Sequence, residues 1–269
     1  MGGYLQLENG GLKTWWDEQG VGEPLVLLHG GLTTNATWAA QMSDFAAHFR
    51  VIAPERRGHG HTPDVEGPLS YDAMAADTIA FVTALVGGPA HLVGWSDGGI
   101  VGLLVAMARP DLVGKLVVIG TNYDVSGVVP ESMEGLASLR PDSDDLAMFR
   151  TPYEAVSPDG PEHWPVVVAK FKEMVATQPT ISVEELGGIT ASTLVVVGDD
   201  DMVTLEHTVS LYRAIPNSEL AVVPGTSHLL AMEKPDLVNR LVLDFLQRDP
   251  VATHMPLRRA RRTPQLRPV

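Results

Sequence analysis

The sequence predicts an α/β protein built on a mostly parallel sheet of about eight strands, with helices on both faces. From residue 24 onward, apolar runs of strand length alternate with longer segments of helical period. The strand-length runs are almost uninterrupted Val, Leu and Ile, which is typical of strands that are covered on both faces. A chain of 269 residues that is 45% apolar can form one large core of this kind.

The predicted elements follow one another in a simple order. Two alternating stretches, residues 4–7 and 12–17, flank Asn9-Gly10-Gly11 and predict an opening β-hairpin. Further strands are expected at residues 24–28, 51–53, 91–94, 116–119, 194–197 and 220–223. The intervening helices are expected at residues 38–49, 71–85, 98–108, 207–214 and 237–247. In such a sheet the carboxyl ends of the strands share one edge, where reacting groups gather.

One long segment, residues 124–189, interrupts this alternation. It is rich in Pro, Asp and Met and has helix-like pieces at residues 144–149 and 164–177. Its position predicts a helical lid inserted after the sixth strand. We therefore expect a core made of residues 1–123 and 190–249, a cap of residues 124–189, and a basic, disordered tail of residues 250–269.

Charge is distributed unevenly along the chain. The formal net charge is −14, yet the last twenty residues hold no acid and five arginines: Arg258, Arg259, Arg261, Arg262 and Arg267. Positions 1–249 therefore carry 14 basic and 33 acidic residues, a formal charge of −19. Such a body repels nucleic acid and anionic membranes, so we expect neither as a partner, and it favours neutral or cationic small molecules.

The absence of cysteine excludes several kinds of chemistry. Disulfides, thiolate metal sites and a cysteine nucleophile are impossible, and we expect no cofactor or metal. The longest strongly apolar stretch, residues 98–108, is about half the length of a membrane span, so we expect a soluble, cytoplasmic protein. The composition leaves the oligomeric state open.

The strongest chemical motif is Gly94-Trp95-Ser96-Asp97-Gly98. Its G-x-S-x-G spacing follows a predicted strand and precedes an apolar helix, which is the context of a sharp strand-to-helix turn that exposes a serine hydroxyl. A glycine-rich turn with an incidental serine is the simpler alternative. A serine nucleophile also needs a base within hydrogen-bond reach and an acid to orient that base.

Two later strand ends offer those partners. The strand at residues 194–197 leads into Asp199, Asp200 and Asp201, and the next strand is followed closely by His228. The order Ser, Asp, His along the chain is the one that α/β proteins with this turn use, although a solvated acidic cluster and a surface histidine would look the same singly.

Two backbone amides are expected to hold a developing oxyanion. The amide of Gly31 lies in a glycine loop after the first buried strand, and that of Asp97 follows the nucleophile. His29 precedes the same loop, and we expect it to make a structural hydrogen bond there and not to act as the base.

Together these features resemble the α/β-hydrolase superfamily over residues 4–247. The resemblance rests on His29-Gly30-Gly31, residues 55–61, the turn at Ser96, the acid loop and the His228 loop. It implies Asp201 as the acid of a Ser96–Asp201–His228 triad. A narrower resemblance, through residues 94–100, is to the biphenyl hydrolase-like (valacyclovirase-like) group. It implies that the Asp97 side chain holds a substrate ammonium, whereas a helix-capping role is the alternative.

The expected function is that of a serine hydrolase without cofactor. It would cleave a small-molecule carboxylic ester, lactone or amino-acid ester through an acyl-enzyme on Ser96. A carbon–carbon bond hydrolase or a cofactor-free peroxidase on the same fold remains open, as does a catalytically silent small-molecule binding protein. In the lid, Trp164, Phe149 and Met148 are expected either to line the substrate pocket or to pack the lid onto the sheet.

Overall fold

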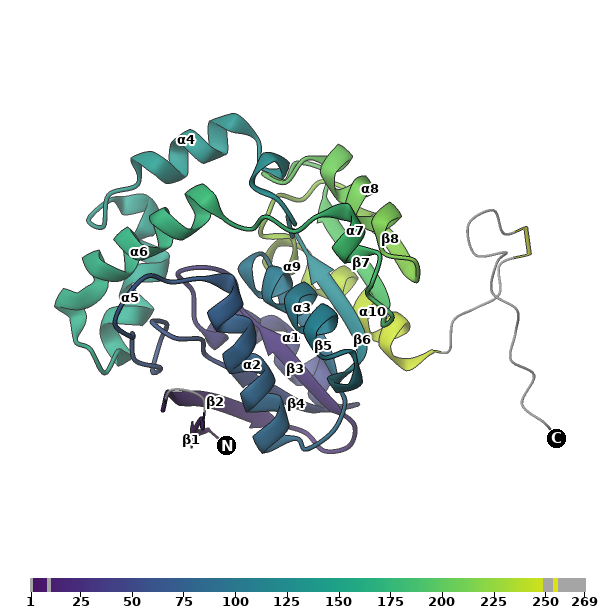
Figure 1. Cartoon of the computed structure of the whole chain (residues 1–269), viewed down its shortest axis with the longest axis horizontal. Helices are drawn as coiled ribbons and strands as arrows, with labels where there is room; N and C mark the ends of the chain where they lie inside the picture. The colour runs from purple at the N-terminus through teal and green to yellow at the C-terminus, as the bar shows by residue number, and fades with distance from the viewer. Residues whose placement is uncertain (1, 9–10, 249–253, 256–269) are drawn as a thin grey trace.

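An eight-stranded sheet forms the centre of the computed structural model, which describes residues 2–8, 11–248 and 254–255 (Figure 1). The strand order is β1-β2-β4-β3-β5-β6-β7-β8, with β1 and β2 antiparallel and the rest of the sheet parallel from β4 to β8. The strands are β1 (Gly3–Gln6), β2 (Lys13–Gln19), β3 (Pro24–Leu28), β4 (Arg50–Pro54), β5 (Ala90–Trp95), β6 (Val113–Ile119), β7 (Ser192–Gly198) and β8 (Ser218–Val223). The predicted fold class is confirmed.

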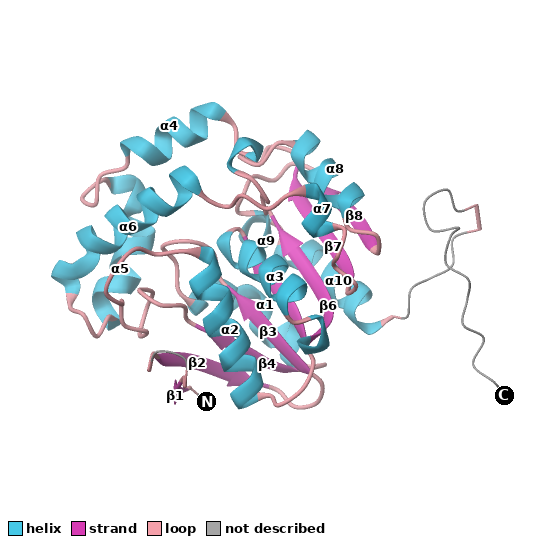
Figure 2. Cartoon of the chain, viewed as in Figure 1, coloured by secondary structure: helices cyan, strands magenta, loops and turns pink. Residues whose placement is uncertain are grey.

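Helices cover both faces of this sheet, as Figure 2 shows. One face carries α2 (Tyr71–Leu85), α3 (Asp97–Ala108) and α8 (Leu205–Ala214), and the other carries α1 (Ala39–Ala46), α9 (Leu230–Glu233) and α10 (Pro235–Gln247). Alternate residues of β3 divide between the two cores: Val26 and Leu28 face the first, and Leu25 and Leu27 face the second. Every residue of β5 is buried, as is typical of a parallel strand that helices cover on both faces.

The chain between β6 and β7 forms a mostly helical insert. Figure 1 shows α4, α5 and α6 together at one end of the sheet, whereas α7 lies beside α8. The insert contains η3 (Val125–Gly127), α4 (Pro130–Ser138), η4 (Asp144–Leu146), α5 (Ala147–Val156), η5 (Pro161–His163), α6 (Trp164–Thr177) and α7 (Val183–Leu186). Because α7 packs against α3 and α8, the insert touches the core over its last residues. The division into core and cap at residue 189 stays a prediction.

Some predicted elements differ in extent from the observed ones. The helix expected at residues 38–49 is shorter, because η1 (Asn35–Trp38) precedes it and α1 ends at Ala46. The short turn η2 (Pro110–Leu112) and helices α4, α7 and α9 were not predicted. Asn9 and Gly10 of the predicted hairpin turn, and the predicted disordered tail apart from residues 254–255, lie outside the described residues. In the described part of the chain, no helix is both long and apolar enough to span a membrane.

Candidate active site

Ser96 occupies a strained turn between β5 and α3. Its φ of +54° and ψ of −121° are unusual for a residue with a side chain. Hydrogen bonds fix the turn, because the Ser96 amide donates to the Ile119 carbonyl (2.8 Å) and the Gly99 amide donates to the Ser96 carbonyl (2.8 Å). A side chain at Gly94 would collide with the Gly98 carbonyl across the turn, and one at Gly98 would collide with the Leu28 carbonyl at the end of β3. The glycines therefore permit the sharp reversal that presents the Ser96 hydroxyl.

His228 and Asp201 lie in hydrogen-bonded series with Ser96. His228 Nε2 is 2.9 Å from Ser96 Oγ, and His228 Nδ1 is 2.7 Å from Asp201 Oδ1. The Val203 amide donates to the same Asp201 oxygen at 3.0 Å, and the Asp201 side chain is fully buried. A buried carboxylate on Nδ1 leaves Nε2 free to accept the serine proton, which is the geometry that nucleophilic catalysis requires.

Only one of the three consecutive aspartates reaches His228. Asp199 Oδ1 accepts a hydrogen bond from the Thr226 amide and so holds the His228 loop through its backbone. Asp201 is the residue whose carboxylate contacts the imidazole. The resemblance to the α/β-hydrolase superfamily also implies Asp201, out of the three consecutive aspartates, as the acid.

Gly120, directly after β6, is a close neighbour of this pair that the sequence analysis did not identify. Its φ is +54°, a conformation that favours glycine. A Cβ atom there would lie 3.0 Å from both Asp201 Oδ2 and His228 Nδ1. The lack of a side chain at this position therefore leaves room for the Asp201–His228 contact. A glycine at the end of an apolar strand run was the available signal.

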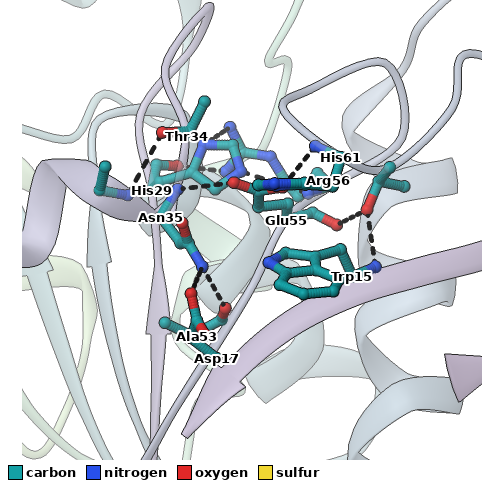
Figure 3. Close-up of polar contacts among 11 residues, drawn as sticks. Trp15, Asp17, His29, Thr34, Asn35, Ala53, Glu55, Arg56 and His61 are labelled. Atoms are coloured by element: carbon teal, nitrogen blue, oxygen red, sulfur yellow. Dashed lines mark hydrogen bonds and ion pairs between the residues drawn. The ribbon is translucent and has the colours of Figure 1, made fainter. Parts of the chain in front are cut away.

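Arg56 holds the loop that carries Gly31, and Figure 3 shows its contact with His29. The Arg56 guanidinium donates to the carbonyls of His29 and Gly30, the latter at 3.0 Å. His59 Nε2 accepts the Leu32 amide at 3.1 Å, where Leu32 has a φ of +56°. These contacts fix the backbone on either side of Gly31, so its conformation is set before a substrate binds.

Both histidines of this network are neutral structural residues. Burial, reinforced by the Arg56 charge, holds the pKa of His29 well below its usual value and lowers that of His59 to about 3. His29 Nε2 accepts the Arg56 amide at 3.2 Å, and Nδ1 lies 2.8 Å from the Gly30 carbonyl oxygen. Both nitrogens of His29 are therefore occupied within the loop, in agreement with the structural role expected for it.

Glu55, which directly precedes Arg56 in the chain, connects this network to His61. Its carboxylate accepts the His61 amide at 2.6 Å and lies 3.0 Å from His61 Nδ1, and the Trp15 ring stacks on His61 (Figure 3). Burial raises the pKa of Glu55, although the hydrogen bonds from His61 oppose the shift. The motif at residues 55–61 thus acts as a structural support of the Gly31 loop.

The Asp97 side chain faces the cavity beside Ser96. Asp97 Oδ1 accepts the Tyr71 hydroxyl at 2.9 Å, whereas Oδ2 is buried without a hydrogen-bond partner. Burial raises the pKa of Asp97, and the positive charge of Arg56 opposes that shift. A Cβ on Gly31 would lie 2.6 Å from Oδ2, so this oxygen borders the predicted oxyanion loop. The Asp97 carboxylate also interacts with its own backbone amide at the start of α3, so the hydrogen bond from Tyr71 is an additional contact.

A cavity of about 220 Å³ opens over Ser96. Ser96, His228, Gly31 and Asp97 lie in its wall, so the structure brings the four predicted groups to one space. Its remaining polar side chains are those of Tyr71, Asn122 and Gln178, and the insert supplies an apolar roof: Val125, Val128, Met133, Leu136, Leu139, Leu146, Phe149, Phe171 and Val175. The site suits a largely apolar small molecule with one polar end.

Trp164 is placed differently from the prediction that it contacts substrate. Its side chain is 2% exposed and packs on Tyr153, with ring centroids 5.3 Å apart. The indole N–H donates to the Pro141 carbonyl at 2.9 Å. Trp164 therefore belongs to the core of the insert, because its ring points toward α5 and not toward Ser96. Phe149 lines the main cavity, and Met148 lines a smaller cleft next to it.

No group of three or more His, Asp or Glu side chains suited to hold a metal ion occurs among residues 2–8, 11–248 and 254–255. The polar groups that converge here are a hydroxyl, an imidazole, carboxylates and backbone amides. This set is suited to acyl transfer by a side-chain nucleophile.

Comparisons with known proteins give relatives of several activities. The chain is 28% identical over 249 residues to "Serine hydrolase BPHL" of Mus musculus, which covers 88% of this chain and 84% of that protein. It is 29% identical over 257 residues to "2-hydroxy-6-oxo-6-phenylhexa-2,4-dienoate hydrolase" of Burkholderia cepacia, covering 86% and 90% of the two chains. Among solved structures, "Est816 as an N-Acyl homoserine lactone degrading enzyme" is 28% identical, with a TM-score of 0.71 over 90% of this chain and 100% of that one.

The sequence profile of the Alpha/beta hydrolase family matches residues 25–241. This range runs from β3 into α10 and includes the turn at Ser96, the acid loop and the His228 loop. The match therefore covers the described site as well as most of the sheet. The chain belongs to the alpha/beta hydrolase family.

Proposed function

We propose that this hydrolase cleaves carboxylic esters of small molecules through an acyl-enzyme on Ser96. The observation that carries the proposal is the hydrogen-bonded series Ser96–His228–Asp201 in the wall of a largely apolar cavity. Lactones and amino-acid esters contain the same bond and fall within the proposal. Binding alone does not require an imidazole held between a serine with a strained backbone and a buried carboxylate, so this arrangement favours an enzyme over a catalytically silent binding protein.

In the proposed mechanism, Ser96 Oγ attacks the acyl carbon while His228 Nε2 takes its proton. The Asp201 carboxylate stabilises the imidazolium, and the amides of Gly31 and Asp97 hold the oxyanion. His228 then protonates the departing alcohol, which leaves the acyl group on Ser96. Water attacks this ester by the same route in reverse, giving a carboxylic acid and free Ser96.

Replacing Ser96 with Ala tests the proposal directly. The Ser96→Ala variant should lose at least about a thousandfold in kcat toward p-nitrophenyl esters, because no other group in the series can form the acyl-enzyme. Thermal unfolding should show the fold intact. Wild-type protein should also bind a fluorophosphonate covalently at Ser96. Turnover retained by the folded variant would remove Ser96 from the mechanism.

Carbon–carbon bond cleavage, as in the named dienoate hydrolase, is the main alternative on this fold. A dienoate is an anion, whereas the cavity carries the Asp97 carboxylate. Within the described lining of the cavity, His228 is the sole basic side chain. The buried Arg56 charge offsets part of the Asp97 charge, but the formal charge of −19 over positions 1–249 remains. The overall charge therefore favours neutral or cationic esters over dienoate anions.

Asp97 gives the proposal its second part, a preference for esters that carry a cation such as an amino-acid ammonium. A substrate ammonium would supply the partner that buried Asp97 Oδ2 lacks. The Asp97→Asn variant should lose about tenfold or more in kcat/KM for an amino-acid ester and should keep the activity toward a neutral ester of equal size. Equal losses for the two esters would show that Asp97 has no such role.

A further inference from the structure

A second cleft lies beside the main cavity and shares two of its walls. Trp95 and Phe149 line both spaces. The cleft has a volume of about 150 Å³, and its other walls are Thr33, Thr34, Ala36, Thr37, Met148, Pro152 and Met232. These come from the chain around η1, from α5 and from α9. An apolar cavity of this size holds about one benzene ring.

The polar groups of this cleft are already engaged. The Thr33 hydroxyl donates to the Gly30 carbonyl (2.8 Å), and that of Thr37 donates to the Thr34 carbonyl (2.9 Å). Thr34 Oγ1 accepts the Ala36 amide at 3.2 Å. An occupant would find few free donors or acceptors here and would contact carbon and sulfur atoms instead. The cleft therefore selects an apolar group.

Two methionines give the cleft an exposed apolar border. Met148 on α5 is 51% exposed and Met232 on α9 is 44% exposed, which is high for apolar side chains of this size. The sulfur-containing side chains are flexible and adapt to ligands of varied shape. Because both also line the cleft, its apolar surface continues to the outside of the molecule.

The position of the cleft relative to His228 identifies which part of a substrate it would hold. His228 must protonate the departing oxygen, so the leaving group extends toward the elements that carry His228. His228 itself lines the main cavity, and the cleft adjoins the loop that carries it: Met232 follows His228 by four residues, and the Trp95 indole donates to the His228 carbonyl at 2.8 Å. The acyl group then occupies the larger cavity, which the insert roofs.

We propose that this cleft, bounded by Ala36, Trp95, Phe149 and Met232, is a leaving-group subsite for an apolar alcohol of about the size of a phenyl ring. The inference rests on the proposed ester hydrolysis and defines its substrate class further. The preferred substrate is an ester whose alcohol carries an aryl or similar apolar group. Phe149 and Trp95 line both spaces, so the alcohol group lies against them as it extends from the main cavity into the cleft.

The first test compares benzyl and ethyl esters of one acid. Wild-type kcat/KM should favour the benzyl ester by about tenfold or more. Ala36→Phe fills the cleft from the exposed surface of η1, and the benzyl-to-ethyl ratio should fall about tenfold. Ala39→Phe adds the same ring at an exposed position that is not part of the cleft lining, and the ratio should stay at the wild-type value. An unchanged ratio in Ala36→Phe, or the same fall in Ala39→Phe, would overturn the proposal.

The second test does not depend on turnover. Benzyl alcohol is titrated into the protein while the Trp95 indole N–H resonance is followed by NMR. Saturable binding that Ala36→Phe abolishes and Ala39→Phe retains is the expected result. Binding that both variants retain would place the alcohol in the main cavity and refute the subsite. If instead no ester is hydrolysed while benzyl alcohol binds the cleft, the ester proposal fails and the binding site stands.

Discussion

Trp95, the residue before Ser96, joins the three loops of the site. Its indole N–H donates to the His228 carbonyl at 2.8 Å, and its ring packs so closely on Gly30 that a Cβ there would lie 2.7 Å away. The side chain is 5% exposed. A shift of this ring would therefore move His228 relative to Ser96 and disturb the backbone next to Gly31.

Removing the indole N–H should weaken catalysis more than stability. Trp95→Phe keeps most of the ring but loses one hydrogen bond, worth about 1 kcal/mol, so kcat should fall about fivefold with little change in KM. Trp164→Phe is the matched control, because its indole also donates to a carbonyl but lies in the core of the insert. It should lower Tm and leave kcat unchanged. Steady-state kinetics and thermal unfolding distinguish the effects of the two variants. An equal loss of kcat in Trp164→Phe would contradict a specific role of the Trp95 hydrogen bond in catalysis.

The residues of the site differ in how far sequence could identify them. Ser96 and His228 could be predicted because each follows the end of an apolar strand run, and parallel strands bring such ends to one edge. The contact from Trp95 to the His228 carbonyl joins positions 133 residues apart, and no local pattern encodes it. The same holds for the Tyr71 hydroxyl on Asp97, since it depends on how α2 packs beside α3.

At the level of elements, helices with a clear core face were predictable. The helix-like pattern at residues 164–177 corresponds to α6, which buries five residues including Val167 and Phe171. Helix α4 has no fully buried residue, and its apolar face is limited to residues such as Met133 and Leu136, which face the cavity. A face this short does not give a clear helical period in the sequence. The direction in which the Trp164 side chain points was not predictable either. The spacing of apolar residues along a helix predicts which face is buried, but not which neighbouring element covers that face.

A charged cluster fastens the insert to the loop after β4. Asp64 Oδ2 accepts from Lys170 Nζ at 2.5 Å and lies 2.9 Å from His163 Nε2, while the Asp64 amide donates to Asp159 Oδ2 at 2.7 Å. Burial opposes ionisation of Asp64, but the hydrogen bonds from Lys170 and His163 outweigh it, so the pKa of Asp64 lies below its usual value. The cluster holds α6 and η5 over the site.

Neutralising Asp64 should loosen the insert in a pH-dependent way. Asp64→Asn should lower Tm by a few degrees at pH 7, because Lys170 loses its counter-charge. Because the pKa of Asp64 is lower in the folded than in the unfolded protein, ionised Asp64 stabilises the fold at pH values above its unfolded pKa of about 3.9. This stabilisation is lost as pH falls through the folded-state pKa. The difference in Tm between the two proteins should therefore begin to shrink as pH falls below about 4 and should keep shrinking as pH falls through the folded-state pKa.

The exposed pair Arg140–Asp142 in the same insert supplies the control, since both side chains are largely in solvent. Asp142→Asn should leave Tm within about a degree of the wild-type value at every pH, because exposed ion pairs add little stability. Scanning calorimetry from pH 3 to 8 compares the variants. Equal effects at the two positions would mean that the Asp64 cluster does not fasten the insert.

The whole molecule adds a long-range field to these local contacts. Positions 1–249 carry a formal charge of −19, and within that acidic body Asp97 lines the cavity while Asp201 lies buried behind His228. Charge of one sign around a low-dielectric cavity raises the local concentration of substrates of the opposite sign. The field thus acts in the same direction as the contact proposed for Asp97, but over a longer range.

Ionic strength should separate the field from the contact. The Debye length falls from about 30 Å at 0.01 M salt to about 8 Å at 0.15 M, so kcat/KM for a cationic ester should fall about threefold across that range. A neutral ester of equal size should change little, since the field exerts no net force on it. In Asp97→Asn, kcat/KM for the cationic ester should be lower at every salt concentration. It should still fall about threefold between 0.01 and 0.15 M salt, because nearly all of the acidic charge remains. If the salt dependence disappears with Asp97, the single buried carboxylate and not the acidic body attracts the cation.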